Sequence, residues 1–305
     1  MEYAERQLLT IPAADYHAAR GINSGSIIAG LRSMRHMATA LERIDREPSR
    51  SMLMGSALHI LALEPQRAGE IVAAPDVDRR TKAGKEQWEA FNASLSAGSI
   101  VLTEEEQISV HTMAANLRQH RIAADLLREG KAEQSIFWPR RTLGAVDTYL
   151  CKARLDWIVP DGTIVDIKTT RDASPQAFAK AAASYKYAHQ AAWYWDALSS
   201  AAGEGQAPKP KRYIIAAVEN VAPYDVALYE LTQDDLDLAR MDLVETLGQW
   251  AREQERGDRL SGPIEDDRMQ TLRMPPWSWK HSFGGAFSKD EAIEQADGDD
   301  VTIPF

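Results

Sequence analysis

Cysteine is almost absent from the sequence, with Cys151 the single example among 305 residues. One cysteine excludes an intrachain disulfide framework and suits the reducing cytosol. The sequence also lacks an apolar run of membrane-spanning length, and its first residues lack the basic-then-apolar pattern of a secretory signal. We therefore expect a cytoplasmic protein without a membrane span. Cys151 lies on the apolar side of an alternating stretch, which predicts a buried thiol rather than a nucleophile.

Positive charge is scarce relative to negative charge. Lysine and arginine together number 35, against 45 aspartate and glutamate residues, and the formal net charge is −10. This balance argues against a protein that coats nucleic acid passively, because phosphate binding needs local positive charge. It does not exclude an enzyme with a focused basic groove. The hydrophobic fraction of 44% is ordinary for globular proteins, and the length allows one large domain or two small ones.

Periodicity and turn signals predict a mixed β-sheet surrounded by helices. Strands are expected near residues 133–141, 148–159, 163–169, 213–219 and 224–229. Helices are expected over 14–45 in two pieces broken near 21–25, over 50–63, around 88–91, from a capping box at 103–106 to about 128, from 175 to about 202, and over 232–254. The 50–63 segment is apolar all round, which predicts a buried helix. The fold class is therefore α/β or α+β.

Residues 149–159 alternate between an apolar and a polar face, as a half-buried strand does. Leu155 and Trp157 fall on the apolar face, whereas Arg154 and Asp156 fall on the other. Turn residues at 160–162 and a second alternating run at 163–168 follow. Together these patterns predict a β-hairpin.

The hairpin brings two acidic residues together. If residues 160–162 form the loop, Val159 faces Thr163, and Asp156 lies directly opposite Asp166. Like charges that face each other across strands are destabilising. A divalent cation between the carboxylates would remove that cost, and their hard oxygen atoms suit Mg²⁺ or Mn²⁺. Lys168 shares the face of Asp166, because side chains repeat every second residue.

An ordinary solvated face is the alternative interpretation of the same hairpin. Asp156 and Asp166 would then be exposed strand residues beside lysine and arginine side chains. A two-residue loop would also change the register and pair Asp156 with Ile167. The hairpin alone leaves both interpretations open.

Two residues outside the hairpin are further candidate metal ligands. His59 lies in the apolar 50–63 segment, where a hydrogen-bonded core histidine is the common outcome. Neutral imidazole is nevertheless a good metal ligand, and His59 could serve if its helix packs against the hairpin. Glu133 begins the strand before the hairpin and could add a carboxylate, with a solvated strand end as the alternative.

Two groups of residues are candidates for contact with DNA. Gln190 and Tyr194 are four positions apart and share one helical face, so both polar tips could reach a scissile phosphate. The alternative is a core aromatic residue with a satisfied polar neighbour. A basic run forms the second group, and such runs are either solvated surface or phosphate contacts. Its members are Arg79, Arg80, Lys82 and Lys85.

Four motifs, in this order, resemble those of nucleases of the PD-(D/E)xK superfamily. They are Gly55-Ser-Ala-Leu-His59, Arg154-Leu-Asp156, Val165-Asp166-Ile-Lys168-Thr-Thr170 and Gln190-Ala-Ala-Trp-Tyr194. More narrowly, the chain resembles the RecE-type group, which is exodeoxyribonuclease VIII-like and often encoded by phages or prophages. That likeness runs from about residue 14 to about residue 280 and includes the segments 78–85 and 222–226. Leu155 departs from the pattern, because the superfamily's name places proline there.

The resemblance implies a restriction-endonuclease-like core and a Mg²⁺-dependent exonuclease, with Mn²⁺ as a substitute. It implies degradation of the 5′-ended strand of linear duplex DNA, which leaves 3′ overhangs for a single-strand annealing protein. It also implies a ring-shaped homo-oligomer. Metal ligands implied by the motifs are His59, Asp156 and Asp166. Lys168 would orient or activate the attacking water, and Gln190 and Tyr194 would support the site.

The expected organisation is a nuclease domain over residues 1–285 followed by an acidic, flexible tail over 286–305. The domain comprises a helical part (1–130), a catalytic core (131–230) and a C-terminal helix with a tryptophan segment (231–285). The tail ends in Ile303, Pro304 and Phe305, and it resembles the acidic tip of bacterial single-stranded DNA-binding proteins. It is either a solubilising tail or a segment that docks into a basic-rimmed apolar pocket on a recombination partner or a neighbouring subunit.

Two other functions are compatible with the sequence. An endonuclease or a RecB-like repair nuclease would use the same fold and metal site, because the difference lies in how DNA enters. A catalytically silent DNA-binding or assembly protein is the other alternative. The intact set of Asp156, Asp166 and Lys168 argues against it.

Overall fold

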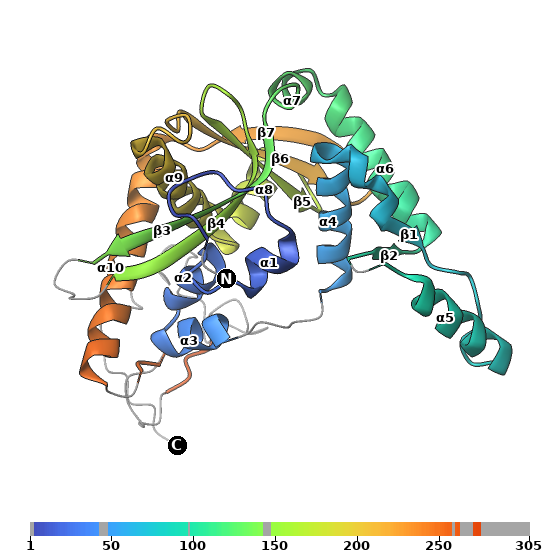
Figure 1. Cartoon of the computed structure of the whole chain (residues 1–305), viewed down its shortest axis with the longest axis horizontal. Coiled ribbons are helices and arrows are strands. Elements are labelled where there is room, and N and C mark those ends of the chain that lie inside the picture. Colours follow the sequence, from blue (N-terminus) through green and yellow to red (C-terminus); the bar gives the residue numbers. More distant parts are fainter. Residues whose placement is uncertain are drawn as a thin grey trace, which may run out of the picture. The chain divides into compact units, whose positions relative to one another are not determined.

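A five-stranded mixed β-sheet forms the centre of the chain (Figure 1). The structure, a computed structural model, describes residues 3–42, 48–96, 98–142, 148–257, 260–262 and 271–275. The strand order is β3-β4-β5-β6-β7, and only β5 and β6 run parallel. The strands are β3 (Lys131–Arg141), β4 (Thr148–Ile158), β5 (Thr163–Thr170), β6 (Arg212–Glu219) and β7 (Val226–Glu230). The predicted fold class, a mixed sheet flanked by helices, is confirmed.

Helices cover both faces of this sheet and divide the core into two layers. Ile164 and Ile215 pack into the first, the α9 layer, with α2 (Ser24–Gly30), α3 (Met34–Glu42), α8 (Pro175–Ser184), α9 (Tyr187–Gly203) and α10 (Gln233–Arg256). Val165 and Ala216 pack into the second, the α4 layer, with α4 (Arg50–Leu63), α6 (Glu104–Gln119) and α7 (Arg121–Leu126). Successive side chains of a strand point to opposite faces, so β5 and β6 supply both layers.

Helix α4 has the predicted bounds, but only its C-terminal half is buried. Leu58 and Leu61 are 0% and 3% exposed, whereas Met52 in the first turn is 58% exposed. Arg50, the first residue of the helix, pairs instead with Glu106 near the exposed start of α6, at 2.9 Å. The expectation of a helix buried on all sides is therefore wrong for its first turns. The first turns of α4 lie beside the solvent-exposed start of α6 rather than against the sheet.

The N-terminal part is more divided than the sequence predicts. Three short helices, α1 (Ala13–Ala18), α2 and α3, replace the expected two, and α6 ends at Gln119 before the separate α7. The predicted capping box of Thr103 and Glu106 starts α6. Helix α5 (Lys82–Ser94) lies between two strands that the periodicity missed, β1 (Ile71–Ala73) and β2 (Ile100–Leu102), and a 3₁₀ turn, η1 (Pro65–Glu70), precedes β1. Three-residue strands are too short to show an alternating pattern.

Two further expectations can be compared with the described residues. Cys151 is fully buried in the α9 layer, as predicted for an inert thiol. Burial raises the pKa of its thiol to about 12, which keeps the thiol protonated.

Among the helices that the structure describes, none is long and apolar enough for a membrane crossing. The predicted boundary at residue 285 and the acidic tail with Ile303, Pro304 and Phe305 lie outside the described residues.

Candidate functional site

The β4–β5 hairpin has the register predicted from its three-residue loop. Trp157 pairs with Val165, and the Val159 N–H donates to the Thr163 carbonyl at 2.9 Å. Gly162 in the loop has a φ of +91°, a conformation that glycine adopts without strain. The alternative register with a two-residue loop is therefore wrong.

Backbone pairing between β4 and β5 stops at the next position, where the two aspartates stand. The Asp156 Oδ2 accepts a hydrogen bond from the Ile167 N–H at 2.9 Å, so a side chain takes the place of ladder bonding there. Asp156 is 8% exposed and Asp166 is 1% exposed. The interpretation of these residues as a solvated strand face is therefore wrong. Carboxylates are seldom buried in this way unless they are paired or bind a cation.

The pairing of β4 with β3, on its other side, is also interrupted next to Asp156. Glu133 of β3 has a φ of +49°, and the β3–β4 ladder skips this residue. Leu155 packs in the α9 layer and Trp157 in the α4 layer, so the expectation that they share a face is wrong. The interruption of the β3–β4 pairing lets β4 turn, so that residues on either side of it point to opposite faces of the sheet. A non-glycine residue with positive φ is strained, and such strain is concentrated at functional sites.

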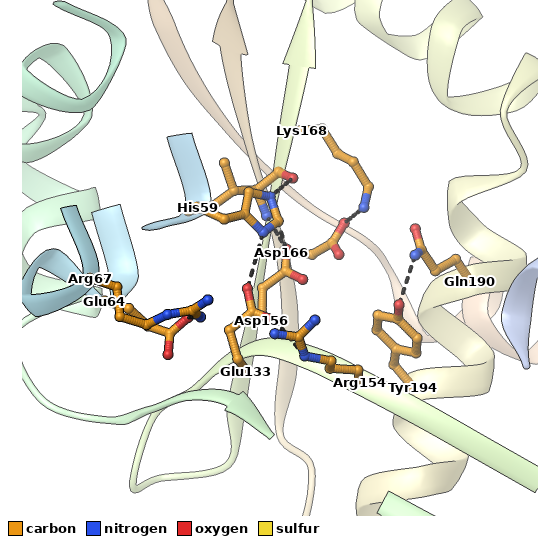
Figure 2. A network of polar contacts seen from close by, with 11 residues as sticks. His59, Glu64, Arg67, Glu133, Arg154, Asp156, Asp166, Lys168, Gln190 and Tyr194 are labelled. Atoms are coloured by element: carbon orange, nitrogen blue, oxygen red, sulfur yellow. Dashed lines mark hydrogen bonds and ion pairs between the residues drawn. The ribbon is translucent and has the colours of Figure 1, made fainter. Parts of the chain in front are cut away.

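His59, Glu133 and Asp156 converge from α4, β3 and β4 (Figure 2). One ligand atom of each residue lies within 4.8 Å of those of the other two. His59 Nδ1 is 3.3 Å from Glu133 Oε1, and His59 Nε2 is 3.6 Å from Asp156 Oδ2. His59 Nε2 also lies 3.1 Å from the Ile167 carbonyl oxygen. An imidazole with two carboxylates is a donor set that can hold a divalent metal ion.

Asp166 lies beside this group and is turned toward Lys168 (Figure 2). The Lys168 Nζ is 2.6 Å from Asp166 Oδ2. Within the described residues, the buried Asp166 Oδ1 and the buried Tyr213 hydroxyl form no hydrogen bond. A buried carboxylate oxygen without a donor calls for an explanation, and a cation or one of its waters would supply it. The residues therefore fit a metal ion. That Asp166 itself binds the ion stays a prediction.

Carboxylates that lie close together in the site repel one another and shift the pKa values of their neighbours. Burial by itself would lower the pKa of His59, but the Asp156 and Glu133 carboxylates outweigh it and raise the pKa to about 9. Burial raises the pKa of Asp166 to about 6, while Lys168 opposes the rise and Asp156 adds to it. A divalent cation would relieve this repulsion and lower both pKa values.

Gln190 and Tyr194 share one face of α9, as predicted, and they are hydrogen bonded to each other. Gln190 Nε2 donates to the Tyr194 hydroxyl at 2.9 Å. Burial raises the pKa of that hydroxyl, and the nearby Asp156 and Asp166 carboxylates raise it further. Figure 2 shows the pair on the side of the aspartates opposite to His59. The Tyr194 hydroxyl therefore stays protonated and can donate a hydrogen bond toward the site.

Two arginines complete the network, and sequence reasoning gave neither a role in the site. The Arg154 Nε is 3.0 Å from Glu133 Oε2. Burial would raise the pKa of Glu133, but His59, and to a smaller extent Arg154 and the nearby Arg67, lower it. Arg154 could have been found from its position two residues before Asp156 on the same strand. Arg67, from η1, has no such signal, because only the packing of α4 brings it close.

The basic run that was predicted to contact DNA lies outside this network. Lys82 and Lys85 are exposed on α5, and Arg79 and Arg80 are exposed in the loop before it. The Arg79 guanidinium stands over the Trp88 ring, 4.4 Å from its centroid. Figure 1 shows α5 extending away from the sheet. Their contact with DNA stays a prediction.

Comparison with known proteins identifies the family. A family model described as a PDDEXK-like domain of unknown function (DUF3799) matches residues 32–259. The chain belongs to this family. The predicted resemblance to the PD-(D/E)xK superfamily is thereby confirmed, whereas membership of the RecE-type group remains a prediction. No curated protein matches the chain.

One solved structure has a similar fold. One from Eubacterium rectale, named "Putative exonuclease", has 13% sequence identity and a TM-score of 0.57, and the match covers 87% of this chain and 96% of that one. At this identity the likeness shows the fold alone. A second, SSO0001, has 15% identity and a TM-score of 0.28 over 68% of this chain and 89% of that one, which is too low to carry an argument.

Proposed function

We propose that this PDDEXK-like chain is a deoxyribonuclease that uses Mg²⁺, with Mn²⁺ as a substitute. The observation that carries the proposal is the convergence of His59, Glu133 and Asp156 beside the buried Asp166–Lys168 pair. A phosphodiester resists attack because it is anionic. A divalent ion in this site would neutralise that charge and lower the pKa of a bound water.

The protein's own side chains supply charge and orientation. His59, Glu133 and Asp156 would hold the ion, with Asp166 as a further ligand. Lys168 is fixed by the Asp166 carboxylate, so its ammonium can orient the attacking water and offset phosphate charge without reorganisation.

The Gln190–Tyr194 pair is proposed to contact the DNA backbone. Because Gln190 donates to the Tyr194 oxygen, the tyrosine hydrogen is left to bond a phosphate oxygen. Arg154 holds the Glu133 carboxylate at 3.0 Å and thereby orients a metal ligand.

The proposed substrate is the 5′-ended strand of linear duplex DNA, and the product is a 3′ overhang. The resemblance to the RecE-type group supports this polarity. The name of the solved structure with a similar fold, "Putative exonuclease", agrees with cleavage from a DNA end. We further propose a ring-shaped oligomer and a single-strand annealing partner, with Ile303, Pro304 and Phe305 as a docking tip. The basic residues Arg79, Arg80, Lys82 and Lys85 would hold duplex DNA.

End-labelled DNA tests the proposal. Linear duplex labelled at the 5′ or the 3′ end is incubated with the full chain and Mg²⁺, Mn²⁺ or EDTA, beside a covalently closed circle of the same sequence. We expect metal-dependent release of nucleotides from the 5′-ended strand and an intact circle. Cleavage of the circle would indicate an endonuclease. Absence of cleavage with either metal would refute nuclease function.

A further inference from the structure

Next to Lys168, an aromatic ladder leads from the core to the surface. Phe178, 2% exposed, stacks on Tyr229 with ring centroids 4.8 Å apart, and it meets Tyr187 at 6.1 Å. Tyr187 in turn stacks on Tyr185 at 5.7 Å with an interplanar angle of 19°. Tyr185 ends the ladder and is 69% exposed. A large aromatic ring is thus held in a fixed orientation while most of its surface remains open to solvent.

The ladder is joined to the proposed catalytic residues in two ways. The Lys168 ammonium stands over the Tyr187 ring, 5.3 Å from its centroid, which is cation–π geometry. Tyr187, Gln190 and Tyr194 also lie on one face of α9, because residues three and seven positions apart repeat the helical turn. The face that carries the Gln190–Tyr194 pair therefore continues to Tyr187, the first residue of α9, which stacks on Tyr185.

We propose that Tyr185 and Tyr187 form a stacking platform for one unpaired nucleobase of the DNA strand being cleaved. This inference rests on the proposed nuclease function. Lys168 would stand at the scissile phosphate, and a base lies within one nucleotide of its phosphate, so the neighbouring base reaches the tyrosine pair. Every base has a π-face, so stacking gives affinity without sequence preference.

The platform selects for unstacked DNA. Within a duplex, both faces of each base are covered by its neighbours, and only base edges are accessible in the grooves. An exposed tyrosine can stack only on a base that has left the helix. The preferred substrate would therefore be a single strand or a duplex end whose terminal pairs have opened. Lys186, exposed between the two tyrosines and with a φ of +60°, adds positive charge near the backbone of such a strand.

The first test measures binding without cleavage. Single-stranded oligonucleotides carry the fluorescent base 2-aminopurine at the first or second position from either end, and the full-length chain is added in Ca²⁺. We expect quenching at one position with the wild type and with Tyr185→Phe, and its loss with Tyr185→Ala. Met241→Ala is the matched control, because Met241 is 68% exposed on α10 and should leave quenching unchanged. Equal quenching by wild type and Tyr185→Ala would overturn the proposal.

The second test uses cleavage and a substrate that lacks the base. With normal DNA in Mg²⁺, Tyr185→Ala should raise KM at least about fivefold, with kcat changed less than about twofold. With an abasic nucleotide at the quenched position, wild type and Tyr185→Ala should have the same KM, because the contact is absent from both. The same penalty on both substrates would refute base stacking.

The two proposals can fail separately. Cleavage by the wild type together with an unaffected Tyr185→Ala variant refutes the platform and leaves the nuclease intact. No cleavage with Mg²⁺ or Mn²⁺ refutes the nuclease, and the quenching test still decides whether Tyr185 stacks on a base.

Discussion

Replacement of Lys168 by methionine should lower the rate of DNA cleavage about a thousandfold while leaving the fold intact. The Lys168 side chain is 16% exposed and its Nζ is 2.6 Å from Asp166 Oδ2, so water screens its charge only partly. A unit charge at about 4 Å contributes roughly 4 kcal/mol at an effective dielectric constant of about 20. A tenfold change in rate corresponds to about 1.4 kcal/mol, so the loss is about three orders of magnitude.

Methionine keeps the length of the stem and removes only the charge. The assay is release of labelled nucleotides from linear DNA at saturating Mg²⁺, so that a change in metal affinity does not enter kcat. Lys211→Met is the matched control, because Lys211 also pairs with an aspartate, Asp161, at 3.0 Å but is 61% exposed. The control should cleave within about twofold of wild type.

Refutation of this reasoning would take one of two forms. A Lys168→Met variant that retains more than a tenth of wild-type kcat would show that the ammonium does not act on the reacting phosphate. Equal losses in Lys168→Met and Lys211→Met would show a general effect of charge. Circular dichroism and thermal unfolding of both variants, without metal, establish that the fold is retained.

Three further changes have defined outcomes. His59→Ala should raise the Mn²⁺ concentration for half-maximal cleavage at least about tenfold by removing a ligand, whereas His111→Ala, at an exposed position, should not. The Thr163 N–H and a nearby lysine lower the pKa of Asp161 to about 2, so its carboxylate stabilises the fold above about pH 4 and loses this effect as pH falls toward 2. Asp161→Asn should therefore cost less than ~1 kcal/mol at pH 7, because the side chain is half exposed, and urea unfolding should show the difference closing toward pH 2. Lys152→Met should reduce the free energy of unfolding by about 1–3 kcal/mol, because three backbone carbonyls at the end of α1 lose their donor; an unchanged urea midpoint would contradict this.

Local sequence determined the hairpin and most of the secondary structure. With a three-residue loop, a side-chain period of two predicts the pairing of Trp157 with Val165 that the structure shows, and it places Asp156 opposite Asp166. The capping box at Thr103 likewise sets the start of α6 locally, because it involves only residues three positions apart. Turns, strand periodicity and helix caps depend on residues that are close together in the chain, so they can be predicted from the sequence.

The site itself was only partly predictable. His59, Glu133, Gln190 and Tyr194 were candidates from residue type and motif order, but nothing local separated a ligand from a core histidine or a solvated glutamate. Arg154 lay within a motif and was still missed as a partner of Glu133. The change of face between Leu155 and Trp157 was predicted wrongly, because the cause lies on another strand.

The sequence by itself therefore determined the fold class, the two registers open to the hairpin and the residues from which a metal centre can be drawn. Tertiary structure alone decided that α4 packs so that His59 meets Glu133, 74 positions away. It also decided that Tyr185 remains exposed at the end of the aromatic ladder. The physical reason is that register and caps are set by backbone geometry over a few residues. The convergence of charged side chains depends on how helices from distant segments pack on both faces of one sheet.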